Sequence, residues 1–148
     1  MRWLLDTNVV SETGRDRPAH AVIEWMRTKP VDDLAISIVT WAELREGAES
    51  SPSSIRRQNL LRWIEKEVST TFDGRILGLS TGILVDWLRL SRRLRTHGMV
   101  RDASDMLIAA TARTYDLIVV TRNTRHFIHT GVVAYDPWNA KTHIMDPP

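Results

Sequence analysis

The sequence contains no cysteine and no long apolar run. Without Cys, a disulfide framework, a thiolate metal site and a thiol nucleophile are excluded. This absence is consistent with the reducing cytoplasm, where we expect the protein to act. No positively charged start leads into an apolar segment, so we expect no signal peptide. The apolar stretches are far shorter than the ~18–20 residues that a membrane span needs, and we expect no membrane association.

An excess of charge of one sign is also absent, because 20 Lys and Arg nearly balance 18 Asp and Glu and leave a net charge of +2. This balance permits a nucleic-acid partner without requiring one. The arginines nevertheless cluster at residues 56–57, 89–95 and 122–125. Such clusters are more often solvated helix faces than RNA contacts, and both interpretations stay open. Six Trp is a high number for this length, and we expect them in the core or at a partner interface.

Short apolar segments alternate with helical patterns along the 148 residues, which are enough for one domain. The expected strands lie at residues 3–5, 34–39, 75–79, 117–120 and 132–135. The expected helices lie at residues 9–13, 18–29, 40–50, 54–68, 80–97 and 102–113. This alternation predicts an α/β fold, a mostly parallel twisted sheet with helices on both faces. We place the domain at residues 1–138 and an irregular tail at 139–148.

Three carboxylates and one amide are expected at the same edge of this sheet. Asp6 directly follows the first strand, and Glu43 lies in the first turn of the helix after the second strand. Asp105 lies in the first turn of the helix before the fourth strand, and Asn123 follows that strand. Ligands of open α/β sheets bind beyond the carboxyl ends of the strands, so these side chains are candidate site residues.

Each of the four also has a purely structural interpretation. Asp6 could cap the helix after it, and Thr40 with Glu43 matches a capping box. Asp105 could interact with the helix dipole, and Asn123 could form a turn. Three acids at one point favour function, because like charges cost free energy unless a cation offsets them.

A divalent cation is the natural counter-charge for such a cluster. Carboxylates without Cys or clustered His select hard ions, which indicates Mg²⁺, with Mn²⁺ as an alternative. Such an ion holds a phosphodiester and lowers the pKa of the water that attacks phosphorus. The five His are widely spaced except for His126 and His129, and we expect surface positions for all of them.

Four segments of the chain resemble, in order, the motifs of PIN-domain proteins, and most of all the VapC-type toxins of bacterial toxin–antitoxin pairs. They read LLDTNVVSE at 4–12, TWAELREG at 40–47, DMLIAATA at 105–112 and VVTRNTRHF at 119–127. The resemblance extends from residue 2 to about residue 138. One such motif is weak, whereas four in order with this spacing are specific.

The resemblance implies a PIN-like nuclease domain at residues 1–138 and a Mg²⁺-dependent endoribonuclease toxin that cleaves structured RNA such as tRNA. It also implies a homodimer and a cognate antitoxin whose tail enters the active-site groove. On the family pattern Asp6, Glu43 and Asp105 bind the metal, and all three with Asn123 are candidate catalytic residues. Asn123 replaces the family's usual fourth acid, and an amide binds metal through oxygen without carrying charge. We therefore expect one firmly held Mg²⁺, through Asp6 and Asp105, with Glu43 bound directly or through water.

Other functions fit the sequence less well. A phosphatase of the haloacid-dehalogenase type needs a second Asp two residues after Asp6, where this chain has Asn8. A signalling receiver domain needs an acidic pair, a further Asp and a Lys that we do not find. The remaining alternative is a catalytically weak or inactive PIN-like module that binds RNA or a protein partner without cleavage, with Asn123 as its sign of decay. Cleavage that is lost on mutation of Asp6 separates this alternative from the toxin.

Overall fold

The computed structural model describes residues 1–146, and in them six strands form one sheet in the order β3-β2-β1-β4-β5-β6. The strands pair in parallel, apart from the antiparallel pair β5 and β6. Their bounds are β1 Trp3–Leu5, β2 Leu34–Ser37, β3 Ile76–Leu77, β4 Ile118–Val120, β5 Val133–Asp136 and β6 Lys141–Ile144. The predicted α/β fold with a mostly parallel sheet is confirmed.

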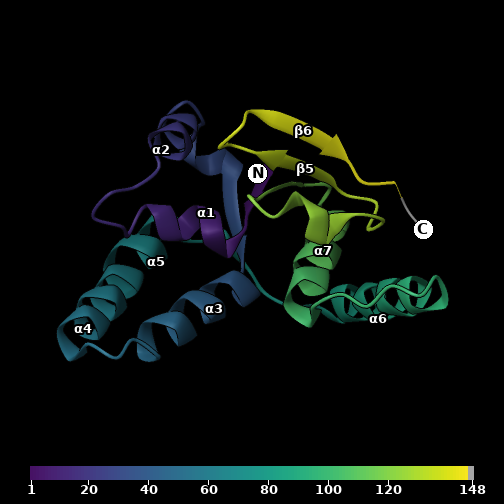
Figure 1. Ribbon diagram of the computed structural model, residues 1–148, viewed down its shortest axis with the longest axis horizontal. Helices are drawn as coiled ribbons and strands as arrows, with labels where there is room; N and C mark the ends of the chain where they lie inside the picture. Colours follow the sequence, from purple (N-terminus) through teal and green to yellow (C-terminus); the bar gives the residue numbers. More distant parts are fainter. Residues whose placement is uncertain (147–148) are drawn as a thin grey trace.

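The helices fill the connections between the strands (Figure 1). They are α1 Thr7–Glu12, α2 His20–Arg27, α3 Ile38–Glu49, α4 Ser54–Trp63, α5 Ser69–Thr71, α6 Thr81–Thr96 and α7 Ala103–Tyr115. Two 3₁₀ turns, η1 Val31–Asp33 and η3 Thr124–Phe127, and the π-helical turn η2 Ile64–Val68 complete the connections. None of the helices in residues 1–146 is long and apolar enough to cross a membrane.

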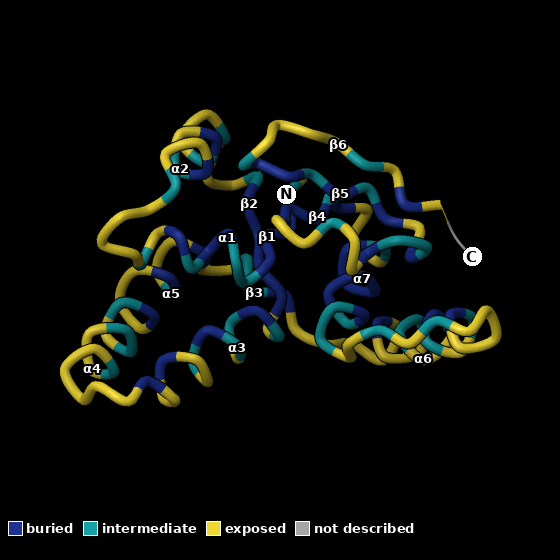
Figure 2. Tube along the Cα trace, viewed as in Figure 1, coloured by how far each residue is buried: buried dark blue, intermediate teal, exposed yellow. Residues whose placement is uncertain are grey.

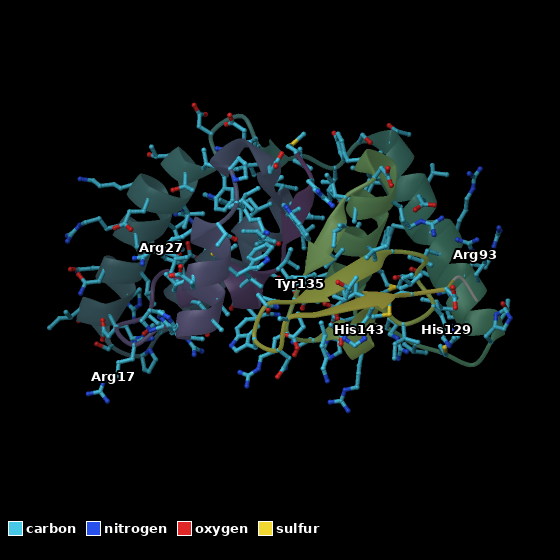
Figure 3. All side chains as sticks on the ribbon, turned by 90° about the horizontal axis from the view of Figure 1, so that it is seen from above. Arg17, Arg27, Arg93, His129, Tyr135 and His143 are labelled. Atoms are coloured by element: carbon cyan, nitrogen blue, oxygen red, sulfur yellow. The ribbon has the colours of Figure 1, made fainter. Side chains whose placement is uncertain are left out.

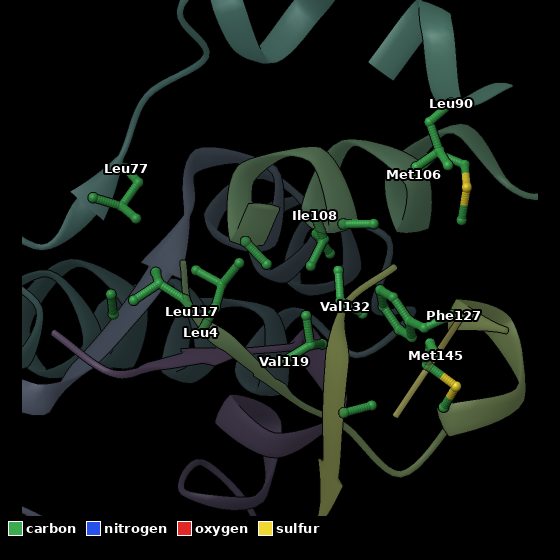
Figure 4. Packing of buried hydrophobic residues seen from close by; sticks show 14 of the residues in the cluster. Leu4, Leu77, Leu90, Met106, Ile108, Leu117, Val119, Phe127, Val132 and Met145 are labelled. Carbon is green, nitrogen blue, oxygen red and sulfur yellow. The ribbon is translucent and has the colours of Figure 1, made fainter. Parts of the chain in front are cut away.

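Two apolar clusters lie on opposite faces of the sheet, because neighbouring residues of a strand point to opposite sides. Leu4 packs in one cluster with residues of α6 and α7, and Leu5 packs in the other with residues of α1, α2 and α3. Figure 4 shows the first cluster, in which Met106 and Ile108 of α7 lie above Leu4. Figure 2 shows the consequence, a buried central sheet with the outer turns of α4 and α6 exposed.

The register of the central strands sets the edge at which ligands would bind. Leu5 of β1 lies opposite Ile36 of β2 and Val120 of β4. The three strands therefore end at the same level. Asp6 consequently leaves the sheet between Ser37 and Thr121, at the carboxyl edge.

The start of α3 differs from the sequence prediction. Ser37 is the N-cap, and its hydroxyl accepts a hydrogen bond from the Val39 backbone N–H at 3.1 Å. Thr40 lies inside the helix and is fully buried, so the capping box of Thr40 with Glu43 is wrong. The second strand ends at Ser37 instead of residue 39, because a buried Ser at the strand end already supplies the cap.

The prediction of an irregular tail at residues 139–148 is wrong for residues 141–144, which form the strand β6. Lys141–Ile144 pair antiparallel with β5, after a turn in which Ala140 has φ +53°. Met145, just beyond the strand, is buried in the cluster of Leu4. The mixed polar sequence of β6 hid this strand, because its side chains are largely exposed at the sheet edge. Pro147 and Pro148 lie outside the described residues, and a domain boundary at 138 stays a prediction.

Candidate active site

Asp6 ends the central strand and is 5% exposed. Its Oδ1 accepts a hydrogen bond from the Thr7 backbone N–H at 2.7 Å, so it also caps α1. Its Oδ2 accepts hydrogen bonds from the Thr121 hydroxyl at 2.6 Å and from the Asn8 amide at 2.9 Å. Burial raises the pKa of Asp6 above its usual value, and the charge of Glu43 adds to the rise. The carboxylate is therefore held rigidly and is costly to ionise without a nearby cation.

Glu43 reaches the same place from the second turn of α3. Because Ser37 caps that helix, the carboxylate of Glu43 is not needed as a hydrogen-bond acceptor at the helix N-terminus. It accepts a hydrogen bond from the hydroxyl of Thr7, the residue directly after Asp6. Thr7 thus connects the first and second candidate acids.

Asp105 lies in the first turn of α7, where the N-cap is Asp102, the residue at which this helix is expected to begin. Its carboxylate Oδ2 is 3.0 Å from the His126 Nδ1, and its side chain is 18% exposed. Burial raises the pKa of Asp105, and the charges of Asp6 and Asp102 raise it further, while His126 partly offsets these effects. The mutual repulsion expected of converging carboxylates is therefore present.

One open cleft of about 520 Å³ brings the sequence-predicted residues together. The predicted residues on its wall are Asp6, Glu43, Asp105 and Asn123. Also on the wall are Thr7, Asn8, Glu46, Asp102, Ser104 and His126. The predicted meeting of three acids and an amide at the carboxyl edge is thus what the structure shows.

Asn123 borders this cleft from the loop after β4. Its backbone N–H donates a hydrogen bond to the Thr121 hydroxyl at 3.0 Å, which fixes the loop. The side chain does not cap the η3 turn that follows. A neutral amide side chain therefore lines the cleft together with the three carboxylates.

Three hydroxyl and amide side chains that support the site were not singled out from the sequence. The Thr121 hydroxyl donates to Asp6 and accepts from the Asn8 amide at 3.2 Å. The Asn8 Oδ1 in turn accepts the Arg122 backbone N–H at 3.0 Å, which ties α1 to the loop after β4. Thr7 holds Glu43. Their available signal was position, since Thr121 directly follows a buried strand and Thr7 and Asn8 are the two residues after Asp6.

His126 is a further missed residue. The surface position predicted for it holds, because its side chain is 51% exposed. Its contact with Asp105 was not expected from the wide spacing of the histidines. The sequence feature that could have indicated this contact is the position of His126 three residues after Asn123. One turn of η3 places both residues on the wall of the cleft.

The donor set fits a hard divalent cation in its chemistry. The cleft offers carboxylate and amide oxygens, and the charge of Glu43 disfavours ionisation of Asp6, as the charge of Asp6 disfavours that of Asp105. Within residues 1–146, however, no group of three or more acidic or imidazole side chains forms a ready-made metal site. An ion held by few protein ligands and completed by water is compatible with this geometry, and Mg²⁺ is usually bound in that way.

Comparisons with known proteins agree with this geometry. The PIN domain family model matches residues 3–132. Toxin FitB of Neisseria gonorrhoeae is 34% identical over 136 residues, which cover 92% of this chain and 98% of FitB. VapC ribonuclease Y4jK of Sinorhizobium fredii is 34% identical, over 91% of this chain and 96% of its own. The tRNA(fMet)-specific endonuclease VapC of Shigella flexneri is 28% identical, over 94% of this chain and 99% of its own.

A solved structure shows the same similarity in three dimensions. The crystal structure of FitAcB from Neisseria gonorrhoeae superposes with a TM-score of 0.86 at 34% identity. The match covers 92% of this chain and 98% of that one. The likeness therefore extends over most of the fold.

Proposed function

The chain belongs to the PIN domain family, and from this premise we propose that it is an endoribonuclease toxin that a cognate antitoxin neutralises. The observation that carries the proposal is the meeting of Asp6, Glu43 and Asp105 in one open cleft. Relatives named toxin and ribonuclease support the activity, and the similarity to a toxin–antitoxin complex from Klebsiella pneumoniae, at 25% identity and a TM-score of 0.67, supports the antitoxin. We propose further that the substrate is structured RNA, with tRNA the first choice, since one relative is named for a tRNA.

The proposed metal is Mg²⁺, with Mn²⁺ as the alternative. Asp6 and Asp105 would hold it, and Glu43 would bind it directly or through water. When bound, the ion polarises a phosphate oxygen and lowers the pKa of the attacking water. Asn123 contributes no charge, so the proposal stays with one firmly held ion.

The side chains of this chain have separate tasks in the proposed cleavage. Thr121 and Asn8 fix the carboxylate of Asp6, and Thr7 fixes that of Glu43. His126 positions Asp105 from the exposed side. One of the three carboxylates orients the water and takes its proton, while the hydrogen bonds prevent the acids from rotating away.

Arg122 is best placed among the clustered arginines to bind a flanking phosphate. It follows Thr121 at the edge of the cleft, and its guanidinium carbon lies 5.4 Å from the Trp138 ring centroid. Arg125 lies in the neighbouring η3 turn. Figure 3 shows Arg93 of α6 at one end of the long axis, and no arginine of 89–95 lines the cleft among the described residues. A solvated face is the simpler interpretation of that cluster.

The test is cleavage of total tRNA by the purified protein in Mg²⁺, in Mn²⁺ and in EDTA. We expect cleavage that needs the metal and is lost in Asp6→Asn and Asp105→Asn. Asp73→Asn is the matched control, because Asp73 is exposed after α5 and does not line the cleft. Metal-independent cleavage, or cleavage that both cleft variants retain, would contradict the proposal and indicate a contaminating nuclease.

The alternative is a module that binds RNA or a protein without cutting, and the neutral Asn123 on the wall of the cleft is the observation in its favour. Asn123→Asp restores a fourth acid. Cleavage by wild-type protein excludes this alternative, whereas cleavage that appears only in Asn123→Asp supports it.

A further inference from the structure

A groove leads away from the acidic cleft, between α1, α3 and α4. Its near section, of about 260 Å³, shares Thr7 and Glu43 with the cleft. Its far section, of about 540 Å³, shares Arg15, Arg56 and Trp63 with the near section. The cleft and both sections therefore form one continuous depression. A polymer bound across the cleft on this side has to follow the groove.

The charge of the depression changes sign along this path. The cleft is lined by carboxylates, whereas the near section contains Arg15 and Arg56, with Glu43 at the border as its one acid in residues 1–146. Arg56 is exposed in the first turn of α4, and none of the ion pairs within the described part of the chain includes it. An uncompensated guanidinium beside a cleft suits a phosphate oxygen, which it can bind through two N–H groups.

A buried acid holds the second arginine at the groove. Glu12 is 3% exposed, and its Oε2 accepts the Ala19 backbone N–H at 2.7 Å. Its Oε1 lies 3.1 Å from the Arg15 Nη1, while the Arg15 side chain remains 60% exposed. Glu12 thus anchors the loop after α1 and leaves most of the Arg15 guanidinium open to a ligand.

Trp63 forms a wall shared by both sections. A Cβ on Gly14 would lie 2.9 Å from two atoms of the Trp63 ring, so only Gly lets the indole lie directly against the backbone there. The π-helical turn η2 begins directly after Trp63. Such turns are frequent at functional sites.

From the groove's continuity with the cleft, its two arginines and its packed indole, we propose that the near section binds the single-stranded nucleotides beside the scissile phosphate. Arg56 and Arg15 contact phosphates, and Trp63 stacks on a base. This inference rests on the proposed function and adds a substrate-binding subsite to it. It is limited to the near section, since Asp16, Glu67 and the 73% exposed Ile55 make the far section unsuited to a polyanion.

The experiment measures binding apart from cleavage. A 12-nucleotide single-stranded RNA with a 5′-fluorescein is titrated with the full-length protein in EDTA at several salt concentrations, and the anisotropy is recorded. We expect Arg56→Ala to bind roughly 5- to 10-fold more weakly, with a salt slope smaller by about 0.7, the value for one lost phosphate contact to a single strand. Arg56→Lys should restore most of the slope.

Trp63→Leu should weaken binding about tenfold while leaving the salt slope unchanged, because base stacking does not release counterions. Arg62→Ala is the matched control. Arg62 is an exposed arginine of the same helix, and it lines neither section of the groove. Thermal melts establish that each variant is folded, and the exposed Arg56 keeps the test decisive if Trp63→Leu unfolds.

Two results would overturn the inference. If folded Arg56→Glu binds and cleaves RNA like wild type, the groove is not an RNA subsite, and a protein partner is the occupant to test next. If Arg62→Ala loses as much affinity as Arg56→Ala, the contribution is general charge and not a subsite. If wild type cleaves tRNA and Arg56→Glu cleaves it equally well, the subsite is contradicted but the proposed function is not. If wild type neither binds nor cleaves RNA, the subsite and the proposed function are both contradicted.

Discussion

At the scale of single residues, Asp6 and Asp105 carry the same charge in different surroundings. Asp6 is almost fully buried and accepts hydrogen bonds from Thr7, Asn8 and Thr121. Asp105 is partly open and contacts His126. An identical substitution therefore has a different effect on stability at the two positions, even where it abolishes activity at both.

We expect Asp105→Asn to leave the Tm of the metal-free protein unchanged or to raise it. The change removes a carboxylate that burial and the charge of Asp6 make costly to ionise. Asp6→Asn should instead cost about 1–2 kcal/mol, because an amide cannot accept all three of the hydrogen bonds that Asp6 accepts. Thermal melts in EDTA measure both, and a large loss in Asp105→Asn would mean that this acid is structural.

Thr121→Val tests the group that holds Asp6. Thr121 is fully buried, donates to Asp6 and accepts the Asn123 backbone N–H. The variant leaves buried partners unsatisfied, so we expect a loss of about 1–3 kcal/mol in urea unfolding. We also expect the cleavage rate to fall by at least about tenfold, because the Asp6 carboxylate is no longer oriented. Thr114→Val, whose hydroxyl bonds only within α7, should change neither quantity appreciably.

The candidate acids could be predicted from the sequence because their chemistry and their place after buried strands are both local signals. Asp6, Glu43, Asp105 and Asn123 line one cleft as predicted. The contacts between distant segments could not be predicted in this way. Thr121 lies 115 residues from Asp6, and only the parallel pairing of β1 with β4 brings their side chains together.

At the scale of elements, the cap of α3 decides where Glu43 lies. The hydroxyl of Ser37 accepts the Val39 backbone N–H in the first turn of the helix, whereas the Thr40 hydroxyl makes a long 3.4 Å contact with the Leu5 carbonyl. Ser37→Ala should therefore cost about 1 kcal/mol, and the nearly isosteric Thr40→Val clearly less. Urea unfolding of both variants measures the difference, and the reverse order would reinstate the capping box.

The elements were predictable where a hydrophobic period or a cap marks them. Ser80 caps α6 and Asp102 caps α7, at the residues where the helices 80–97 and 102–113 are expected to begin, and Gly98 follows α6 with φ +72°. The strand β6 carries no such mark, because Lys141–Ile144 lie at an edge with exposed side chains. Its partner strand, and not its own composition, makes it a strand.

At the scale of the whole molecule, α6 leaves apolar side chains in solvent. Leu84, Val85 and Leu88 are 38%, 37% and 57% exposed, and Leu88 lies one turn after the other two on the same side of the helix. We propose that this face contributes to the homodimer that the family resemblance implies. Light scattering should give about twice the 17.0 kDa of one chain, and Leu88→Glu should give a monomer. Val31→Glu, at another exposed apolar residue, should remain dimeric, and a monomeric wild type would contradict the proposal.

The central position of β1 also determines when a newly made chain can assemble its cleft. β1 lies between β2 and β4, so the strand that carries Asp6 lacks one neighbour until residues 118–120 have left the ribosome. At typical synthesis rates of about 5–20 residues per second, Asp6 waits on the order of ten seconds for Thr121. A nascent chain therefore has no assembled cleft until residues 118–120 have emerged, and under the proposed function it cannot cleave RNA before that point.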